Sequence, residues 1–148
     1  MNIIVDADAC PVKEEVLRVA RRHHLEVTLV ANSRMRLPKE KRLRLVVVSD
    51  GFDAADDWIV ARVQPLDVVV TADVVLASRC VKAGARVLGP GGKPFTEDNV
   101  GQAVAMRDLM ADLRSADPFR QGGGKGFTKA DRSRFLDALE REIRAVLA

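Results

Sequence analysis

Short apolar runs alternate along this chain with stretches of helical periodicity, and this alternation limits the folds open to it more than any other feature. Several runs are apolar on both faces, which is typical of strands buried in a parallel sheet. They lie at residues 2–6, 27–30, 45–48, 67–71 and 86–88. Helical spacing of apolar residues occurs between them, at residues 12–23, 54–63 and 74–83. We therefore predict a three-layer α/β domain, with a mainly parallel sheet of four or five strands and helices on both faces.

The last third of the chain predicts two further helices and a glycine-rich segment between them. The first helix is expected over residues 96–113. Residues 115–127, with glycines at 122–124 and 126, are typical of a linker. Residues 128–148 predict a C-terminal amphipathic helix, because Phe135, Leu139 and Ile143 recur at helical spacing. The expected organisation is an α/β domain over residues 1–114, then the linker, then the helix.

Composition narrows the class of protein without naming a function. The chain has 148 residues and no apolar run long enough to span a bilayer, so we expect no membrane partner. Its two cysteines, Cys10 and Cys80, are too few for a disulfide framework and are expected to be structural. The N-terminal residues do not resemble a signal peptide. These features predict a cytoplasmic protein and leave its oligomeric state open.

Acidic residues follow three of the predicted strands. Asp6 and Asp8 follow the first strand, Asp50 follows the third, and Asp73 follows the fourth. In an open parallel sheet the carboxyl ends of the strands share one edge, and ligands bind there. We therefore expect Asp6, Asp8 and Asp73 to converge. Asp50 precedes Gly51, so a role in a turn is the stronger prediction for it.

The helix predicted from residue 54 adds a further acid to the same edge. In helical projection Asp56 lies on the apolar stripe with Ile59 and Val60, so it should face the sheet. Asp57 is rotated about 100° away from that stripe and ranks second. Asp53 is well placed to be the N-cap of this helix.

Carboxylates gathered at one edge repel each other unless some are protonated or a cation holds them together. Oxygen ligands of this kind favour Mg²⁺ or Mn²⁺. The predicted metal ligands are Asp6, Asp8, Asp56, Asp57 and Asp73, and Thr71 should lie beside them. Asp6, Asp8, Asp56 and Asp73 are also the predicted catalytic residues, since a metal can activate water for phosphodiester hydrolysis. The competing interpretation is that these aspartates cap helices and turns.

The segment Ile3-Ile4-Val5-Asp6-Ala7-Asp8-Ala9-Cys10-Pro11 resembles the start of the bacterial YaiI/YqxD-like family. The resemblance extends through residues 53–59, 69–73 and 89–93. That family is similar to the PIN-like and NYN metal-dependent ribonucleases, which implies a PIN-like fold and metal-ligand roles for Asp6, Asp56 and Asp73. PIN-like nucleases often carry a fourth acid beyond the third. Here residues 74–77 are Val-Val-Leu-Ala, which leaves the number of metals open.

A basic segment between the second and third predicted strands is the candidate nucleic-acid contact. It contains Arg34, Arg36, Lys39, Lys41 and Arg42 against a single acid, Glu40. Such a segment can bind a phosphate backbone, although it can equally be a solvated loop. Aromatic residues make up only 4% of the chain, so stacking on bases should be limited. We expect a nucleic-acid partner, with RNA favoured over DNA.

The expected function is metal-dependent hydrolysis of phosphodiester bonds, most readily in RNA, and two alternatives stay open. An apolar strand followed by Asp-x-Asp also begins the aspartyl-phosphate phosphatases of the HAD type. In that case Asp6 would be the nucleophile and Asp8 the acid or base. Cys10 stands where that pattern has Thr or Val. The second alternative is a non-catalytic module that binds nucleic acid or protein.

Overall fold

The computed structural model describes residues 1–8, 10–49, 53–116 and 127–147. The strands are β1 (Asn2–Asp6), β2 (Glu26–Ala31), β3 (Leu43–Val47), β4 (Val68–Val70), β5 (Arg86–Leu88) and β6 (Pro94–Phe95). The helices are α1 (Lys13–His23), α2 (Ala54–Arg62), α3 (Val74–Lys82), α4 (Glu97–Ala116) and α5 (Lys129–Leu147). Strands and helices follow the predicted order, and the α/β class is confirmed.

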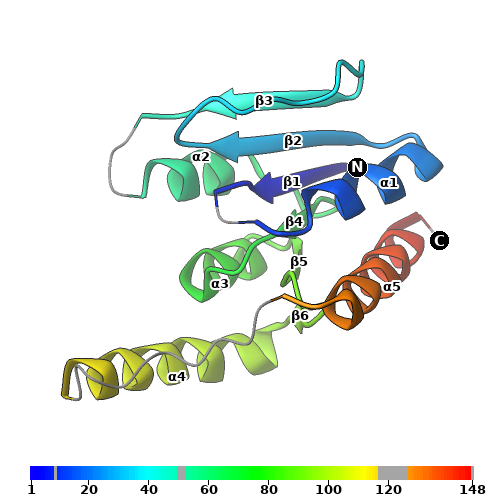
Figure 1. Ribbon diagram of the computed structural model, residues 1–148. Coiled ribbons are helices and arrows are strands. Elements are labelled where there is room, and N and C mark those ends of the chain that lie inside the picture. Colours follow the sequence, from blue (N-terminus) through cyan, green and yellow to red (C-terminus); the bar gives the residue numbers. More distant parts are fainter. Residues whose placement is uncertain (9, 50–52, 117–126, 148) are drawn as a thin grey trace.

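All of the described strands belong to one sheet, in the order β3-β2-β1-β4-β5-β6 (Figure 1). Neighbours from β3 to β5 are parallel, and β6 pairs antiparallel to β5. The prediction of four or five strands was therefore one short in the described part of the chain. The missed strand, β6, has two residues and begins with Pro94. A strand this short leaves no periodicity, and its proline is tolerated because β6 lies at the edge of the sheet.

Helices cover both faces of the sheet, as predicted (Figure 1). α1 and α5 pack on one face, where Val16, Leu29 and Phe135 are fully buried. α2 and α3 cover the other face, where Ile59 and Leu76 are fully buried. Removing these apolar side chains from water is the main stabilising contribution to the fold.

The C-terminal helix α5 is part of the same hydrophobic core as the sheet. Phe135, Leu139 and Ile143 lie in one cluster with residues of β1, β2 and α1. Arg132 ties the start of α5 to the segment after β1, because its Nη1 donates to Pro11 O at 2.7 Å and to Glu15 Oε1 at 3.0 Å. The predicted amphipathic helix is confirmed. Most of the predicted linker, residues 117–126, lies outside the described residues.

The chain reverses its direction of sheet growth between β1 and β4. β2 and β3 are added on one side of β1, and β4, β5 and β6 on the other. At such a switch point the loops after the two central strands diverge and leave a crevice at their carboxyl ends. Asp6 ends β1 and Thr71 follows β4, so both lie at this crevice. In the described part of the chain, no helix is both long and apolar enough to cross a membrane.

Candidate metal centre

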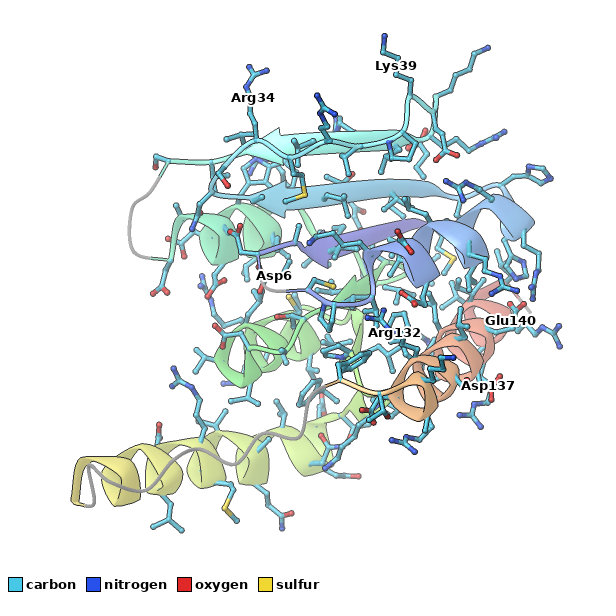
Figure 2. The ribbon with its side chains drawn as sticks, in the orientation of Figure 1. Asp6, Arg34, Lys39, Arg132, Asp137 and Glu140 are labelled. Carbon is cyan, nitrogen blue, oxygen red and sulfur yellow. The ribbon has the colours of Figure 1, made fainter. Side chains whose placement is uncertain are left out.

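A cleft of about 440 Å³ opens at the carboxyl ends of β1, β2 and β4. Figure 2 shows Asp6 at the end of β1, where this cleft begins. The acidic residues that line it are Asp6, Asp8, Asp53, Asp56 and Asp73. They come from the end of β1 and the segment after it, from the start of α2 and from the segment after β4. The four acids predicted to converge on one metal position, Asp6, Asp8, Asp56 and Asp73, line this cleft together, and metal binding by them stays a prediction. Asp50 lies outside the described residues.

Thr71 connects the acids at the ends of β1 and β4. Its hydroxyl donates to Asp6 Oδ2 at 3.0 Å and accepts from Asp73 N at 3.0 Å. The distance between Asp6 Oδ2 and Asp73 N is therefore at most the sum of these two hydrogen-bond lengths. Thr71 is 2% exposed, so the connection is shielded from water. The predicted position of Thr71 beside the carboxylates is confirmed.

Two of the acids also hold the backbone around the cleft. Asp73 is the N-cap of α3, because its Oδ1 accepts from Val75 N at 2.9 Å and from Leu76 N at 3.3 Å. Asp8 Oδ2 accepts from Asn32 N at 2.9 Å, which ties the end of β1 to the end of β2. The capping interpretation therefore holds for Asp73. Since a carboxylate has about four acceptor sites, capping leaves it able to bind a further partner.

Three acids lie at the start of α2 and differ in their surroundings: Asp53, Asp56 and Asp57. Asp56 is half-buried and lines the cleft. Asp57 is exposed and pairs instead with Arg79, whose Nη1 lies 3.0 Å from Asp57 Oδ1. Asp53 occupies the N-cap position but its side chain makes no capping hydrogen bond, so the predicted capping interaction is wrong. Its backbone has φ 61°, a left-handed conformation that aspartate tolerates, and the side chain lines the cleft.

The electrostatic state of the cleft follows from burial and mutual repulsion. Burial, reinforced by the negative charges of Asp73 and Asp6, raises the pKa of Asp56 to about 6. Burial also raises the pKa of Asp6, where the hydrogen bond from Thr71 acts against it and the charges of Asp73 and Asp8 reinforce it. A cation placed between Asp6 and Asp56 would therefore stabilise the ionised forms of both carboxylates. Burial raises the pKa of the Cys10 thiol, which lies in the same cleft and is neutral at pH 7.

Comparison with known proteins identifies the family. The model of a family described as "Uncharacterized BCR, YaiI/YqxD family" matches residues 4–145. The chain belongs to the YaiI/YqxD family. It is 58% identical over 145 residues to a UPF0178 protein of Rhodopseudomonas palustris strain HaA2, covering 98% of this chain and 88% of the relative. It is also 58% identical over 145 residues to a UPF0178 protein of Ruegeria pomeroyi, covering 97% and 94%. No solved structure matches the chain.

The donor set of this YaiI/YqxD protein fits a hydrated divalent ion better than a closed cage. Among the described residues, no group of three or more His, Cys, Asp or Glu side chains is arranged to hold a metal directly. One oxygen each of Asp6, Asp8 and Asp73 already accepts a hydrogen bond, from Thr71, from Asn32 N and from the start of α3 respectively. Mg²⁺ commonly keeps several waters and binds through only one or two carboxylates.

The basic segment of this YaiI/YqxD chain is only partly near the cleft. Residues 32–42 run back from the end of β2 to the start of β3, and Met35 and Leu37 in this segment pack against the core cluster that includes α1 and α5. Figure 2 shows Arg34 and Lys39 pointing away from the sheet, with Arg34 nearer the carboxyl ends of the strands. Arg42 lies beside Val27 at the amino end, because Val27 N donates to Arg42 O at 2.8 Å. Arg34 and Arg36 are therefore nearer the cleft than Lys39, Lys41 and Arg42.

Two polar residues in the cleft were missed from the sequence. Asn32 directly follows β2 and lines the cleft. The rule applied to the aspartates, that polar residues after parallel strands converge, would have found it. Arg107 reaches the cleft from α4, between residues with no distinctive pattern. Only the packing of α4 against α3 brings Arg107 to this edge, so no local signal could have shown it.

Proposed function

We propose that this chain is a Mg²⁺- or Mn²⁺-dependent phosphodiesterase that hydrolyses RNA. The proposal rests on the cleft at the switch point of the sheet, which is lined by Asp6, Asp8, Asp56 and Asp73. The pKa values of Asp6 and Asp56 are raised, which means that ionising these carboxyl groups costs more free energy in the folded chain than in water. Clusters of this kind are characteristic of functional sites.

Asp6, Asp56 and Asp73 would hold the ion, one or two of them by direct contact and the others through the waters that complete its coordination. A bound divalent ion would supply positive charge, which lowers the pKa of a water bound to it and stabilises charge on a scissile phosphate. Asp8 has one oxygen fixed by Asn32 N, so its carboxylate is oriented to accept a proton or position a water. The resemblance to PIN-like and NYN ribonucleases, drawn from Asp6, Asp56 and Asp73, supports the same roles.

Arg107 gives the cleft the positive charge that an anionic substrate requires. It lies with Pro90 among the residues that line the cleft, facing a wall that is otherwise acidic. A guanidinium binds a phosphate through paired N–H donors, whereas a carboxylate repels it. We assign Arg107 to a phosphate next to the scissile one. Arg34 and Arg36 would contact the strand as it leaves the cleft, with little base selectivity because aromatic residues are few.

The decisive experiment compares single-stranded RNA, duplex RNA and a phosphomonoester, each with Mn²⁺, Mg²⁺ or a chelator. Cleavage of RNA should require the metal and should be lost in Asp6→Asn and Asp73→Asn. Asp98→Asn is the matched control, because Asp98 is an exposed acid in the first turn of α4 and does not line the cleft. Metal-independent cleavage, or equal activity of Asp6→Asn and Asp98→Asn, would contradict the proposal. Monoester hydrolysis with a phosphate attached to Asp6 would favour the HAD-type alternative.

A further inference from the structure

A second cleft, of about 600 Å³, lies at the amino ends of the strands, on the face covered by α2. Its floor comes from three neighbouring strands, because Ile4 pairs with Thr28 and Thr28 pairs with Arg44. Side chains of residues paired in this way stand beside each other on one face of the sheet. Trp58 and Arg62 of α2 form a wall, and Leu66 lies at the rim.

Arg62 is held in place against the aromatic wall of this cleft. Its guanidinium carbon lies 4.3 Å from the centre of the Trp58 ring, and its Nη1 donates to Trp58 O at 3.2 Å. A guanidinium carries five N–H donors in a rigid plane, so this contact orients the group and leaves most of its donors for a ligand. Stacking on Trp58 also means that little conformational entropy is lost when an anion binds.

The two arginines of the cleft have no acidic partner in the described part of the chain. Arg21, Arg86 and Arg132, in contrast, each pair with a glutamate at 2.5–3.0 Å. The acid that lines the cleft is Asp67, which is 4% exposed. Its oxygens accept from Asn2 N at 3.0 Å and from Gln64 N at 2.9 Å, so it holds the loop after α2 instead of neutralising an arginine.

We infer that this cleft binds a nucleoside phosphate. Arg44 and Arg62 bind the phosphate, because two unpaired guanidinium groups, one on the floor and one on the wall of the cleft, suit a doubly charged anion. The base packs against Trp58 and Leu66, whose side chain is 63% exposed and gains from being covered. The ligand is either a free nucleotide or the terminal nucleotide of an RNA. The inference does not depend on the phosphodiesterase, since Asp6 lies at the opposite end of β1.

Trp58 is the single tryptophan of the chain, so its fluorescence reports on this cleft alone. The probes are AMP, adenosine and inorganic phosphate, titrated at constant ionic strength. AMP should change the emission saturably, with adenosine and phosphate each at least about tenfold weaker. Arg44→Ala should weaken AMP binding about tenfold or more, the loss of one charged pair of hydrogen bonds. Arg18→Ala is the matched control, because Arg18 is exposed on α1 at the other face of the sheet.

RNA with a 5′-phosphate and the same RNA with a 5′-hydroxyl, in chelator, separate the two sources of ligand. Competition with AMP by the phosphorylated RNA alone identifies a strand end, and no competition by either RNA identifies a free nucleotide. Absence of saturable AMP binding, equal affinity for AMP and inorganic phosphate, or equal losses in Arg44→Ala and Arg18→Ala would overturn the inference. Asp6→Asn should keep AMP binding, so failure of the phosphodiesterase and failure of this site are distinguishable.

Discussion

The Thr71 hydroxyl donates a 3.0 Å hydrogen bond to the Asp6 carboxylate, and this contact joins the two strands at which the sheet changes direction. The bond stabilises the ionised form of Asp6 against the burial that raises its pKa. One hydroxyl therefore helps to set the charge state of the candidate metal centre.

Replacing Thr71 with valine removes this hydroxyl and keeps the shape of the side chain. We expect Thr71→Val to raise the pKa of Asp6 further, because a hydrogen bond to the charged form is lost. The free energy of unfolding should fall by about 1–3 kcal/mol, since Asp73 N also loses its acceptor. Carboxyl-resolved NMR titration measures the pKa. Thr28→Val, at another buried threonine of the sheet, should leave the pKa of Asp6 unchanged.

Asp56 makes stability depend on pH in the direction opposite to an ordinary paired acid. Its pKa is about 6 in the folded chain and near 3.8 when unfolded, so the folded state binds more protons between these values. Stability is therefore highest below about pH 4 for this group and falls as pH rises through 6. Because Asp56 is only half-buried and solvent screens its charge, we expect a loss of only about 1 kcal/mol. Urea unfolding in chelator at pH 4.5 and 7 should show a smaller loss in Asp56→Asn than in the wild type, since the raised pKa of Asp6 still contributes in the variant.

A divalent ion should offset that loss by stabilising the ionised carboxylates, and at lower pH it should displace the proton of Asp56. At pH 5.5 Asp56 is mostly protonated, so binding of Mn²⁺ should release about half a proton or more. At pH 8 the same binding should release almost none. Calorimetry in two buffers with different ionisation enthalpies measures the release. Proton release that is the same at both pH values would show that the ion binds somewhere other than beside Asp56 and Asp6.

Residues whose positions follow from a general rule of the fold could be predicted from the sequence. Residues whose positions depend on how two helices pack could not. Asp6, Asp8 and Asp73 were located because parallel strands end at one edge, and Asp56 was separated from Asp57 by the period of the helix. Arg107 was missed because its position depends on how α4 packs against α3, which no local pattern encodes. The sequence could not show which aspartate caps its helix, because Asp53 and Asp73 both directly precede one. In the structure the Asp73 side chain caps α3, whereas the Asp53 side chain makes no capping hydrogen bond.

Arg107 should affect the substrate and leave the metal unchanged. We expect Arg107→Ala to weaken RNA binding about tenfold, the effect of losing a charged hydrogen bond to phosphate. Binding of Mn²⁺ should change little or tighten slightly, because a positive charge leaves the cleft. Fluorescence anisotropy with labelled RNA in Ca²⁺ or chelator, and calorimetry with Mn²⁺, separate the two effects. Arg141→Ala, at an exposed position of α5, is the matched control.

The basic segment tests whether RNA follows the edge of the sheet or only enters the cleft. Arg34 and Arg36 lie just beyond Asn32, which lines the cleft, whereas Lys39 and Lys41 lie towards the opposite end of the sheet. Each phosphate contact to single-stranded RNA contributes about 0.7 to the slope of log affinity against log salt concentration. The double variant Arg34→Ala/Arg36→Ala should therefore flatten the slope by about 1.4.

The double variant Lys39→Ala/Lys41→Ala removes the same charge and should leave that slope unchanged for an RNA of about six nucleotides. If both variants flatten it equally, the effect comes from net charge and the segment has no defined contact. If neither does, RNA enters the cleft from the side of Arg107. A longer RNA adds one more distinction, because a strand that follows the edge would reach Lys39 and gain slope with length. This dependence on length is the result expected for a strand that runs from the cleft along β3.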